Sequence, residues 1–364
     1  MKTILIIAGT RPEIIKTAPV IIELRKNSDF KTVYCLTGQH ITMAQEALSI
    51  FNLVPDEDLN IMRPNQTLNM IAESVFAKLP PVLEQHKPDV VLVQGDTTTA
   101  AMAALACFNM KIPVGHIEAG LRSFNMNAPY PEECNRRLIS VVSKYNFCPT
   151  DIAKQNLLRE AVPADSIYVT GNTVVDALML IKGKYNLDNY NEIDERIRKP
   201  FVLITAHRRE SFGKGFENIC EALKLIALKY PEYQYVYPVH LNPNVKEPVY
   251  KYLSDLKNIV LIPPLPYLKL LVLLKNCEFV ITDSGGIQEE APSFRKHCIV
   301  LREVTERMES VNMGMSELVG TDVEKIIKSV ERTIKNNINH NVTKNPYGDG
   351  HASKRIVDIL RKNV

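Results

Sequence analysis

Short apolar runs rich in β-branched residues alternate with longer amphipathic segments over most of this 364-residue chain. The runs have the length and composition of buried strands, and the segments between them repeat apolar residues at helical spacing. The strand candidates are 4–9, 32–38, 90–95, 112–117, 201–206, 233–240, 258–263, 279–284 and 298–302, and the clearest helical segments are 12–24, 97–109, 216–229 and 323–335. Because parallel strands need long crossover connections, this alternation predicts βαβ units and an α/β fold.

A polar stretch without a strand pattern, residues 182–200, separates two groups of strand candidates. Such stretches are typical of the surface near a domain boundary. The length of the chain allows two domains of ordinary size, each with its own apolar core. We therefore expect two Rossmann-like halves, followed by an amphipathic helix at the end of the chain.

The charge and the cysteine pattern of the chain exclude several classes of protein. A formal net charge of +3, with Lys and Arg spread along the sequence, is too weak for a nucleic-acid-binding protein. The seven cysteines form no C-x-x-C pair, which argues against a disulfide framework or a thiolate zinc site and favours a reducing compartment. Charged residues interrupt the long apolar stretches, and the first apolar run lacks a signal-peptide cleavage site. We expect a cytoplasmic protein with no membrane insertion and no nucleic-acid partner.

Polar and charged residues gather in the loops that follow five of the strand candidates. The loops are GTRPEIIK, GDTTT, IEAGLRS, AHRRE and DSGGIQEE. In open α/β sheets, ligands bind beyond the carboxyl ends of the strands. Five such loops together predict an anionic ligand and proton-transfer chemistry.

The loop DSGGIQEE indicates a phosphate site. Ser284, Gly285 and Gly286 would present backbone N–H groups at a helix start, where the helix dipole favours an anion. The alternative is that Asp283 or Ser284 only caps the helix, and the residue types alone do not separate the two interpretations. The glycine patterns G-x-G-x-x-G and Walker A are missing from the sequence, so neither NAD nor ATP is expected.

Cationic side chains at two other strand ends also have two interpretations. Arg11 and Lys16 suit charge-assisted contact with a pyrophosphate, and the alternative is a solvated helix start with Pro12 in its first turn. His207 stands with two arginines in AHRRE, which fits a phosphate-neutralising cluster, although a single histidine at such a position is more often structural. Taken one at a time, the structural interpretations are favoured.

Three acidic motifs, around Asp96, Glu118 and Glu132, predict proton transfer. For Asp96 the alternative is a helix N-cap, and for Glu132 it is a first-turn position after Pro131. The occurrence of all three motifs in one chain favours an acid/base site. His116 and Glu118 are two residues apart and would need distant partners to bind a metal, so a site without a metal or another cofactor is expected.

In order and spacing, these motifs resemble those of the non-hydrolysing UDP-N-acetylglucosamine 2-epimerases of bacteria. The motifs are GTRPEIIK, LTGQH, QGDTTT, HIEAGLRS, PYPEECNR, GNTVVDAL, TAHRRESFG, VYPVHLNPNV, TDSGGIQEEAPS and NPYGDGHAS, and they span nearly the whole chain. The resemblance implies a GT-B-like architecture, in which two Rossmann-like domains with parallel sheets face a central cleft. The first would be residues 1–170, with helix 352–364 packing back on it, and the UDP-binding second would be 171–351. A UDP-sugar substrate, a homodimer and a role in capsule or other cell-envelope polysaccharide biosynthesis are also implied.

The family mechanism, as the resemblance implies it, is anti elimination of UDP across C1 and C2 to give 2-acetamidoglucal, then re-addition of UDP with protonation on the opposite face. The resemblance implies acid/base roles for Asp96, Glu118 and Glu132. It does not assign which carboxylate acts on which face of the sugar ring. His207, Arg11 and Lys16 would stabilise the departing pyrophosphate. The other implied substrate contacts are Arg136, the phosphate-binding Ser284, Gly285 and Gly286, the ribose-binding Glu290, and Arg307.

The chain departs from the family pattern at several positions. Met308 replaces the proline of E-R-P-E, Leu270 stands where an aromatic commonly backs the uracil, and His297 ends an altered S-L-G-K-P segment. Thr42 and Glu46 replace glutamines of members with an allosteric UDP-GlcNAc site, so that regulation is not expected here. Three alternatives therefore stay open: epimerisation of a related UDP-sugar such as a diacetamido uronic acid, hydrolysis to free ManNAc, and a GT-B glycosyltransferase or UDP-sugar-binding protein.

Overall fold

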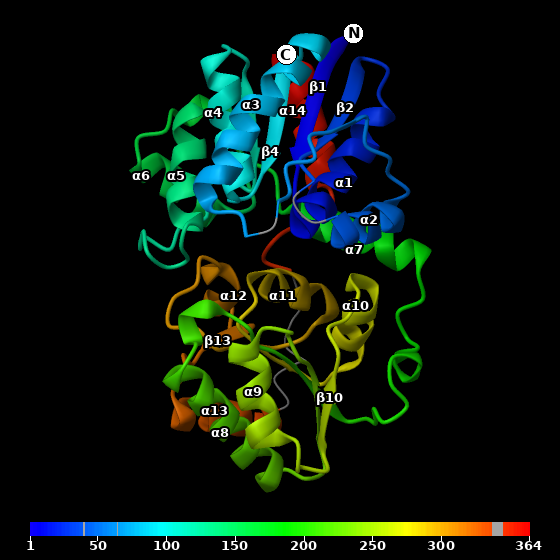
Figure 1. Ribbon diagram of the computed structural model, residues 1–364, viewed down its shortest axis with the longest axis vertical. Helices are drawn as coiled ribbons and strands as arrows, with labels where there is room; N and C mark the ends of the chain where they lie inside the picture. The colour runs from blue at the N-terminus through cyan, green and yellow to red at the C-terminus, as the bar shows by residue number, and fades with distance from the viewer. Residues whose placement is uncertain (39–40, 64, 337–344) are drawn as a thin grey trace. The chain divides into compact units, whose positions relative to one another are not determined.

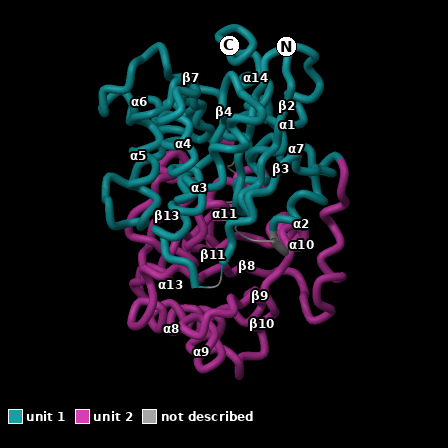
Figure 2. The backbone as a smooth tube through the Cα atoms, turned by 45° about the horizontal axis from the view of Figure 1, so that its top comes forward, with its two compact units in different colours: residues 1–183, 347–364 teal, residues 184–346 magenta. Residues whose placement is uncertain are grey.

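The computed structural model describes residues 1–38, 41–63, 65–336 and 345–364. The chain forms two compact units, which are residues 1–183 with 347–364, and residues 184–346 (Figure 2). Within the described residues, each unit contains one parallel sheet whose strands alternate with helices along the chain (Figure 1). The α/β fold predicted from the sequence is confirmed.

In the first unit the strands lie in the order β3-β2-β1-β4-β5-β6-β7, and neighbouring strands are parallel. The chain runs outward from β1 to β2 and β3 and then returns to the other side of β1 with β4. This reversal creates a topological switch point between β1 and β4, the place where open α/β sheets bind ligands. The elements are β1 Lys2–Ala8, α1 Arg11–Arg25, β2 Phe30–Leu36, α2 Ile41–Phe51, β3 Glu57–Asp58, α3 Leu68–His86, β4 Val90–Gln94, α4 Thr98–Asn109, β5 Val114–Ile117, α5 Glu132–Val142, β6 Tyr145–Cys148, α6 Asp151–Arg159, the 3-10 helix η1 Ala164–Ser166, β7 Ile167–Val169, α7 Thr173–Lys184 and α14 Ala352–Asn363.

The central strands of this unit form because their apolar residues are buried on both faces of the sheet. Leu5 and Val91 pack on one face with apolar residues of α3 and α4. The last helix, α14, packs against α1 and so belongs to the first unit. Asp176 of α7 fixes its start by accepting hydrogen bonds from the N–H groups of Ala352 and Ser353 at 3.2 and 2.8 Å.

The second unit repeats this arrangement with the strand order β10-β9-β8-β11-β12-β13, also parallel. Its switch point lies between β8 and β11, because the chain runs from β8 out to β10 and returns beside β8. The elements are η2 Tyr190–Glu192, β8 Phe201–Thr205, η3 Arg209–Ser211, α8 Lys214–Lys229, β9 Gln234–Pro238, α9 Pro243–Leu253, β10 Ile259–Ile262, α10 Tyr267–Asn276, β11 Val280–Thr282, α11 Gly285–Glu290, η4 Ala291–Phe294, β12 Cys298–Val300, α12 Met308–Asn312, β13 Ser316–Leu318 and α13 Val323–Asn336.

All nine strand candidates are strands, and the four helical segments begin and end within two residues of their expected limits. The strands missed from the sequence are β3, β6, β7 and β13, in which polar residues or tyrosine interrupt the apolar pattern. Residues 39 and 40 of the LTGQH motif and the side chain of Thr42 lie outside the described residues. Among the residues that are described, no helix is long and apolar enough to cross a membrane.

Candidate active site

The polar loops predicted from the sequence follow neighbouring strands in each sheet. In the first unit they follow β1, β4 and β5, and in the second they follow β8 and β11. Because the strands are parallel, their carboxyl ends lie at one edge of the sheet, and the loops of each unit are brought together there. We call the residues at these ends the unit 1 cluster and the unit 2 cluster.

Glu118 and Lys16 form a buried ion pair in the unit 1 cluster. Glu118 follows β5 directly, Lys16 lies in α1, and the two residues are 7% and 6% exposed. Lys16 Nζ donates to Glu118 Oε2, and Asn172 Nδ2 donates to the same oxygen at 3.2 Å. Glu118 has a φ of 71°, in the left-handed region that residues other than glycine seldom adopt. Backbone outliers of this kind concentrate at functional sites.

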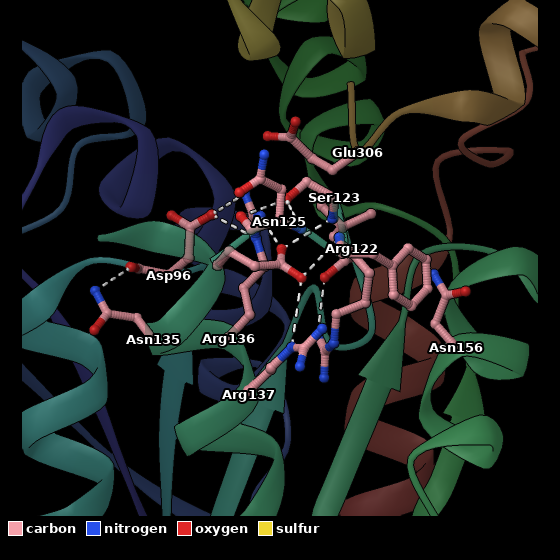
Figure 3. A network of polar contacts seen from close by, with 12 residues as sticks. Asp96, Arg122, Ser123, Asn125, Asn135, Arg136, Arg137, Asn156 and Glu306 are labelled. Atoms are coloured by element: carbon pink, nitrogen blue, oxygen red, sulfur yellow. Dashed lines mark hydrogen bonds and ion pairs between the residues drawn. The ribbon is translucent and has the colours of Figure 1, made fainter. Parts of the chain in front are cut away.

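Asp96 forms the second ion pair of this cluster, with Arg136 of α5 (Figure 3). Arg136 Nε and Nη2 lie 2.9 and 2.7 Å from Asp96 Oδ2, and Asn135 Nδ2 donates to the backbone oxygen of Asp96 at 2.8 Å. Arg136 Nη1 donates to Glu133 Oε2 at 2.9 Å. The guanidinium therefore joins a half-buried carboxylate, Asp96, to a fully buried one, Glu133.

Glu133 also holds the loop that follows β5. Its two carboxylate oxygens accept the N–H groups of Ser123 and Phe124 at 2.9 and 3.1 Å. Glu132, the sequence-predicted acid/base residue, begins α5 and is half-buried. Successive helical residues point about 100° apart, so the two adjacent glutamates have different surroundings. The sequence PYPEECNR does not indicate that Glu133 is more deeply buried than Glu132.

Glu13, which the sequence analysis did not single out, links the loops after β1 and β4. Its Oε2 accepts the N–H groups of Gly9 and Thr10 at 2.9 and 2.6 Å, and its Oε1 accepts the Thr97 hydroxyl at 2.7 Å. Burial raises the pKa of Glu13 above its ordinary value, and these hydrogen bonds oppose the rise. Arg11, the first residue of α1, is half-buried beside this turn. The T-x-x-E spacing of a capping box was the available signal for Glu13.

His116 fixes the backbone just before Asp96. It is completely buried in β5, and its Nε2 donates to the Gly95 carbonyl oxygen at 2.7 Å. Burial lowers the pKa of His116 to about 4, so the ring is neutral near pH 7. In this structure His116 holds the loop that contains Asp96.

In the unit 2 cluster, Ser284 is the N-cap of α11. Its Oγ accepts the N–H of Ile287 at 3.5 Å, and its own N–H donates to Thr282 Oγ1 at 2.9 Å. The capping interpretation raised by the sequence is therefore correct for this side chain. Capping by the hydroxyl does not engage the N–H groups of Gly285 and Gly286, which lie in the first turn where an anion binds favourably.

Gly285 allows Arg307 to approach the start of α11 closely. A Cβ at position 285 would lie 2.7 Å from Arg307 Cζ, whereas a Cβ at Gly286 would meet nothing closer than Ser284 Oγ at 3.9 Å. Arg307 is buried, and its guanidinium is held by Glu289, with Nε 2.8 Å from Oε1, and by Glu306. The guanidinium therefore lies against the start of α11.

Glu290 and the three family departures lie in different surroundings of the second unit. Glu290 is buried, and its Oε1 accepts the hydroxyl of Tyr267 in α10 at 2.7 Å. Leu270 lies one turn later in α10 and is half-buried. Met308 begins α12 and is exposed, whereas His297 is buried, which lowers its pKa.

His207 follows β8 and stacks on His240, which follows β9. The ring centroids are 5.4 Å apart with an interplanar angle of 13°. Asp283, completely buried after β11, accepts the N–H groups of His207 and Arg208 on Oδ2 at 2.6 and 2.7 Å. Its Oδ1 lies 3.6 Å from His207 Nδ1. From the sequence alone, Asp283 is only a possible helix cap, and no signal marks His240.

The two clusters differ in what they can do chemically. Carboxylates paired with cations, as in unit 1, support proton transfer, and helix-start amides with His and Arg, as in unit 2, suit a phosphate group. No group of three or more His, Cys, Asp or Glu side chains among the described residues is placed to hold a metal ion.

Comparison with known proteins gives the family of the chain. A family model described as UDP-N-acetylglucosamine 2-epimerase matches residues 22–361. The chain is 48% identical to the UDP-N-acetylglucosamine 2-epimerase of Yersinia pestis, over 99% of this chain and 98% of that protein. It matches the crystal structure of UDP-GlcNAc 2-epimerase from Neisseria meningitidis bound to UDP-GlcNAc with a TM-score of 0.94 and 47% identity, over 100% of both chains. The Methanocaldococcus jannaschii UDP-GlcNAc 2-epimerase in complex with UDP-GlcNAc and UDP matches with a TM-score of 0.87 and 39% identity, also over 100% of both chains. With its GT-B-like fold, the chain therefore belongs to the UDP-N-acetylglucosamine 2-epimerases, a family of isomerases.

Proposed function

We propose that this enzyme interconverts UDP-GlcNAc and UDP-ManNAc without hydrolysis, by anti elimination of UDP to 2-acetamidoglucal and re-addition of UDP. The observation that carries the proposal is the unit 1 cluster, in which Asp96 and Glu118 follow adjacent strands and Glu132 lies one turn before the Arg136 that pairs with Asp96. Three carboxylates from separate motifs thus belong to one edge of one sheet.

The elimination needs both a base and a stabilised leaving group. The C2 proton is not next to a carbonyl, so it becomes acidic only as UDP departs and positive character develops at C1. The base takes the proton, the C2–H electron pair becomes the C1=C2 bond, and the C1–O pair leaves with UDP. Re-addition reverses these steps with the proton delivered to the other face. Inversion therefore requires two proton-transfer groups, each worth about 10² to 10⁴ in rate.

We assign proton transfer to Asp96, Glu118 and Glu132. The Arg136 contact orients the Asp96 carboxylate, which suits a base. Glu118 is held in place by the buried ion pair with Lys16 and by Asn172, so its carboxylate has a fixed orientation. Lys16 is proposed to position Glu118 in addition to the diphosphate contact expected from the motif.

The unit 2 cluster is proposed to bind the UDP part of the substrate. The N–H groups of Ser284, Gly285 and Gly286 would hold phosphate oxygens, and Arg307 would add a positive charge beside them. Glu290, oriented by the Tyr267 hydroxyl, would accept the ribose hydroxyls. The other proposed contacts are His207 and Arg11 at the departing diphosphate and Arg136 beside Asp96.

The proposal is tested by incubating the enzyme with UDP-GlcNAc in D2O. Deuterium is expected at C2 of both UDP-GlcNAc and UDP-ManNAc, measured by NMR and mass spectrometry. Epimerised sugar that keeps its original C2 proton after full turnover would rule the mechanism out. Accumulation of free ManNAc would instead assign the hydrolysing reaction. C2 exchange with a diacetamido uronic acid UDP-sugar and none with UDP-GlcNAc would assign the related substrate.

We further propose that the enzyme acts as a homodimer in the cytoplasm and supplies a sugar nucleotide for cell-envelope or capsular polysaccharide. The seven cysteines are all free thiols, which fits a reducing compartment. Light scattering during size-exclusion chromatography should give twice the 41.1 kDa mass of the chain. A mass equal to that of one chain would contradict the dimer.

A further inference from the structure

We propose that Asp283 is a positioning residue that holds the His207 ring at Nδ1, with His240 supporting the face of that ring, so that Nε2 is the nitrogen offered to the diphosphate. The inference rests on the proposed function, because it assumes that His207 assists the departure of UDP. It adds two residues to the expected machinery, and it says which ring nitrogen serves the reaction.

Capping of the loop after β8 uses only one of the two carboxylate oxygens of Asp283. Its Oδ2 alone accepts both backbone N–H groups of the β8 loop, from His207 and Arg208. Its Oδ1 is buried and has no hydrogen bond to any residue that the structure describes. Leaving a buried carboxylate oxygen without a donor is unfavourable, because the oxygen has lost its contact with water. A donor is therefore expected at Oδ1.

His207 Nδ1 is the donor that the fold brings to Oδ1. The distance of 3.6 Å is short enough for an ion pair, and a small rotation of the ring would bring it to hydrogen-bond length. With Nδ1–H held by Asp283, the second proton of the His207 imidazolium lies on Nε2, where it can be donated to a diphosphate oxygen. The His207 side chain is 44% exposed, so the ring is open to a ligand while its partner Asp283 is completely buried.

His240 limits how the His207 ring can turn. Asn242 N–H donates to His240 Nδ1 at 3.1 Å, so this nitrogen carries no proton and the His240 ring is neutral. Burial, and after it the proximity of His207, lower the pKa of His240, which agrees with that assignment. A neutral ring can lie flat against a His207 imidazolium without the repulsion that a second cation would bring.

The alternative is that Asp283 only caps the β8 loop, and Asp283→Asn separates the two roles. Asparagine keeps an oxygen for the two backbone N–H groups but loses the charge and can present an NH₂ group to the ring. In serine proteases, the corresponding change in an Asp–His pair leaves the fold intact and costs about 10⁴ in turnover through the wrong tautomer.

The kinetic test is a double-mutant cycle of Asp283→Asn and His207→Gln. Asp283→Asn is expected to lower kcat at least about a hundredfold with little change in KM. The double variant should be no more than about threefold slower than the slower single variant, because both changes remove one function. Multiplicative losses, or an Asp283→Asn enzyme with near-normal kcat, would overturn the proposal. His240→Leu, which keeps Asp283, should lower kcat by about tenfold or less.

A spectroscopic test identifies which nitrogen of the His207 ring carries the proton. It uses ¹⁵N NMR of histidine-labelled enzyme in alkaline buffer. The His207 signals are assigned from their loss in His207→Gln. The neutral ring should carry its proton on Nδ1 in the wild type and on Nε2 in Asp283→Asn, and an unchanged tautomer would overturn the proposal. The matched control is Asp322→Asn, at a carboxylate that accepts the Lys325 N–H at 2.8 Å in α13 and should alter neither measurement.

The two readouts also separate this inference from the proposed function. If His207→Gln leaves turnover intact, the role of His207 in UDP departure is wrong, and so is the claim that Nε2 serves the diphosphate. The NMR measurement would still decide whether Asp283 holds Nδ1. If His207→Gln is inactive but the His207 tautomer is the same in Asp283→Asn as in the wild type, the proposed function stands and the positioning role is wrong.

Discussion

The unit 1 and unit 2 clusters occupy equivalent places in two similar parallel sheets but are built from different groups. Both lie beside a topological switch point, between β1 and β4 and between β8 and β11. In unit 1, side chains pair with side chains, as in Lys16 with Glu118 and Arg136 with Asp96. In unit 2, the carboxylate that follows β11, Asp283, accepts two backbone N–H groups, and a glycine begins α11.

The difference teaches how one topology serves two kinds of chemistry. Proton transfer needs carboxylates whose orientation is fixed, and buried cations supply that in unit 1. Binding of a diphosphate needs donors that approach closely, and a helix start with glycine supplies them in unit 2. Unit 1 should therefore be sensitive to loss of a charge, and unit 2 to gain of a methyl group.

The largest expected effect is that of Asp96→Asn. The change removes a base while keeping the shape of the side chain, so kcat should fall by about 10² to 10⁴. UDP should still bind, because Asp96 is not among the groups proposed to hold it and most of those groups lie in unit 2. C2 exchange in D2O and calorimetric titration with UDP measure the two effects. The matched control is Asp89→Asn, at a half-buried carboxylate that accepts the Thr3 N–H at 2.8 Å, and it should leave kcat unchanged. Near-normal exchange in Asp96→Asn would remove Asp96 from the mechanism.

The next largest effect is a loss of folding stability at low pH that is caused by His116 in unit 1. The pKa of His116 is about 4 in the folded protein and 6.5 without burial, so as pH falls below 6.5 the unfolded chain takes up a proton first. Stability is full above pH 6.5 and is lost progressively toward pH 4, by about 3 kcal/mol for this group. His116→Gln retains a donor for the Gly95 oxygen and should lose this part of the pH dependence. Denaturant unfolding of both proteins across this pH range measures it, and equal slopes would contradict it.

Glu133→Gln should have a smaller effect on stability. The side chain is completely buried and accepts N–H groups from Ser123 and Phe124 as well as from Arg136, so losing its charge should cost about 1–3 kcal/mol. Because Arg136 also orients Asp96, kcat should fall too. Glu160→Gln, at the partly exposed partner of Arg122, is the matched control and should cost less. Equal losses of stability in the two variants would show that burial does not set the difference.

The fold could be predicted from the sequence because its central strands are buried on both faces. Continuous apolar runs such as VVLVQ identify β4 without knowledge of its neighbours. The strands β3 and β13 could not be found, because Glu57–Asp58 and Ser316–Leu318 are defined by pairing with the next strand rather than by their own composition.

The site residues could be predicted where they stand at strand ends, and their partners could not. Asp96, Glu118 and His207 all follow strands, so position alone marked them. The pairing of Lys16 with Glu118 joins residues 102 positions apart, and no local pattern carries such a contact. His240 was missed for the same reason, because it meets His207 only through the pairing of β8 with β9.

The smallest expected effect tests the methyl sensitivity of unit 2. Gly285→Ala would place a Cβ 2.7 Å from Arg307 Cζ, so the guanidinium must move, and UDP affinity should fall about tenfold. Gly183→Ala is the matched control, because nothing lies within 4 Å of its Cβ, and it should leave UDP affinity unchanged without lowering Tm, since alanine favours the α7 helix over glycine. Gly286→Ala meets nothing closer than 3.9 Å within the protein, so a loss of affinity there without a loss of Tm would report contact with UDP itself. Normal affinity and Tm in Gly285→Ala would show that the approach of Arg307 does not shape the site.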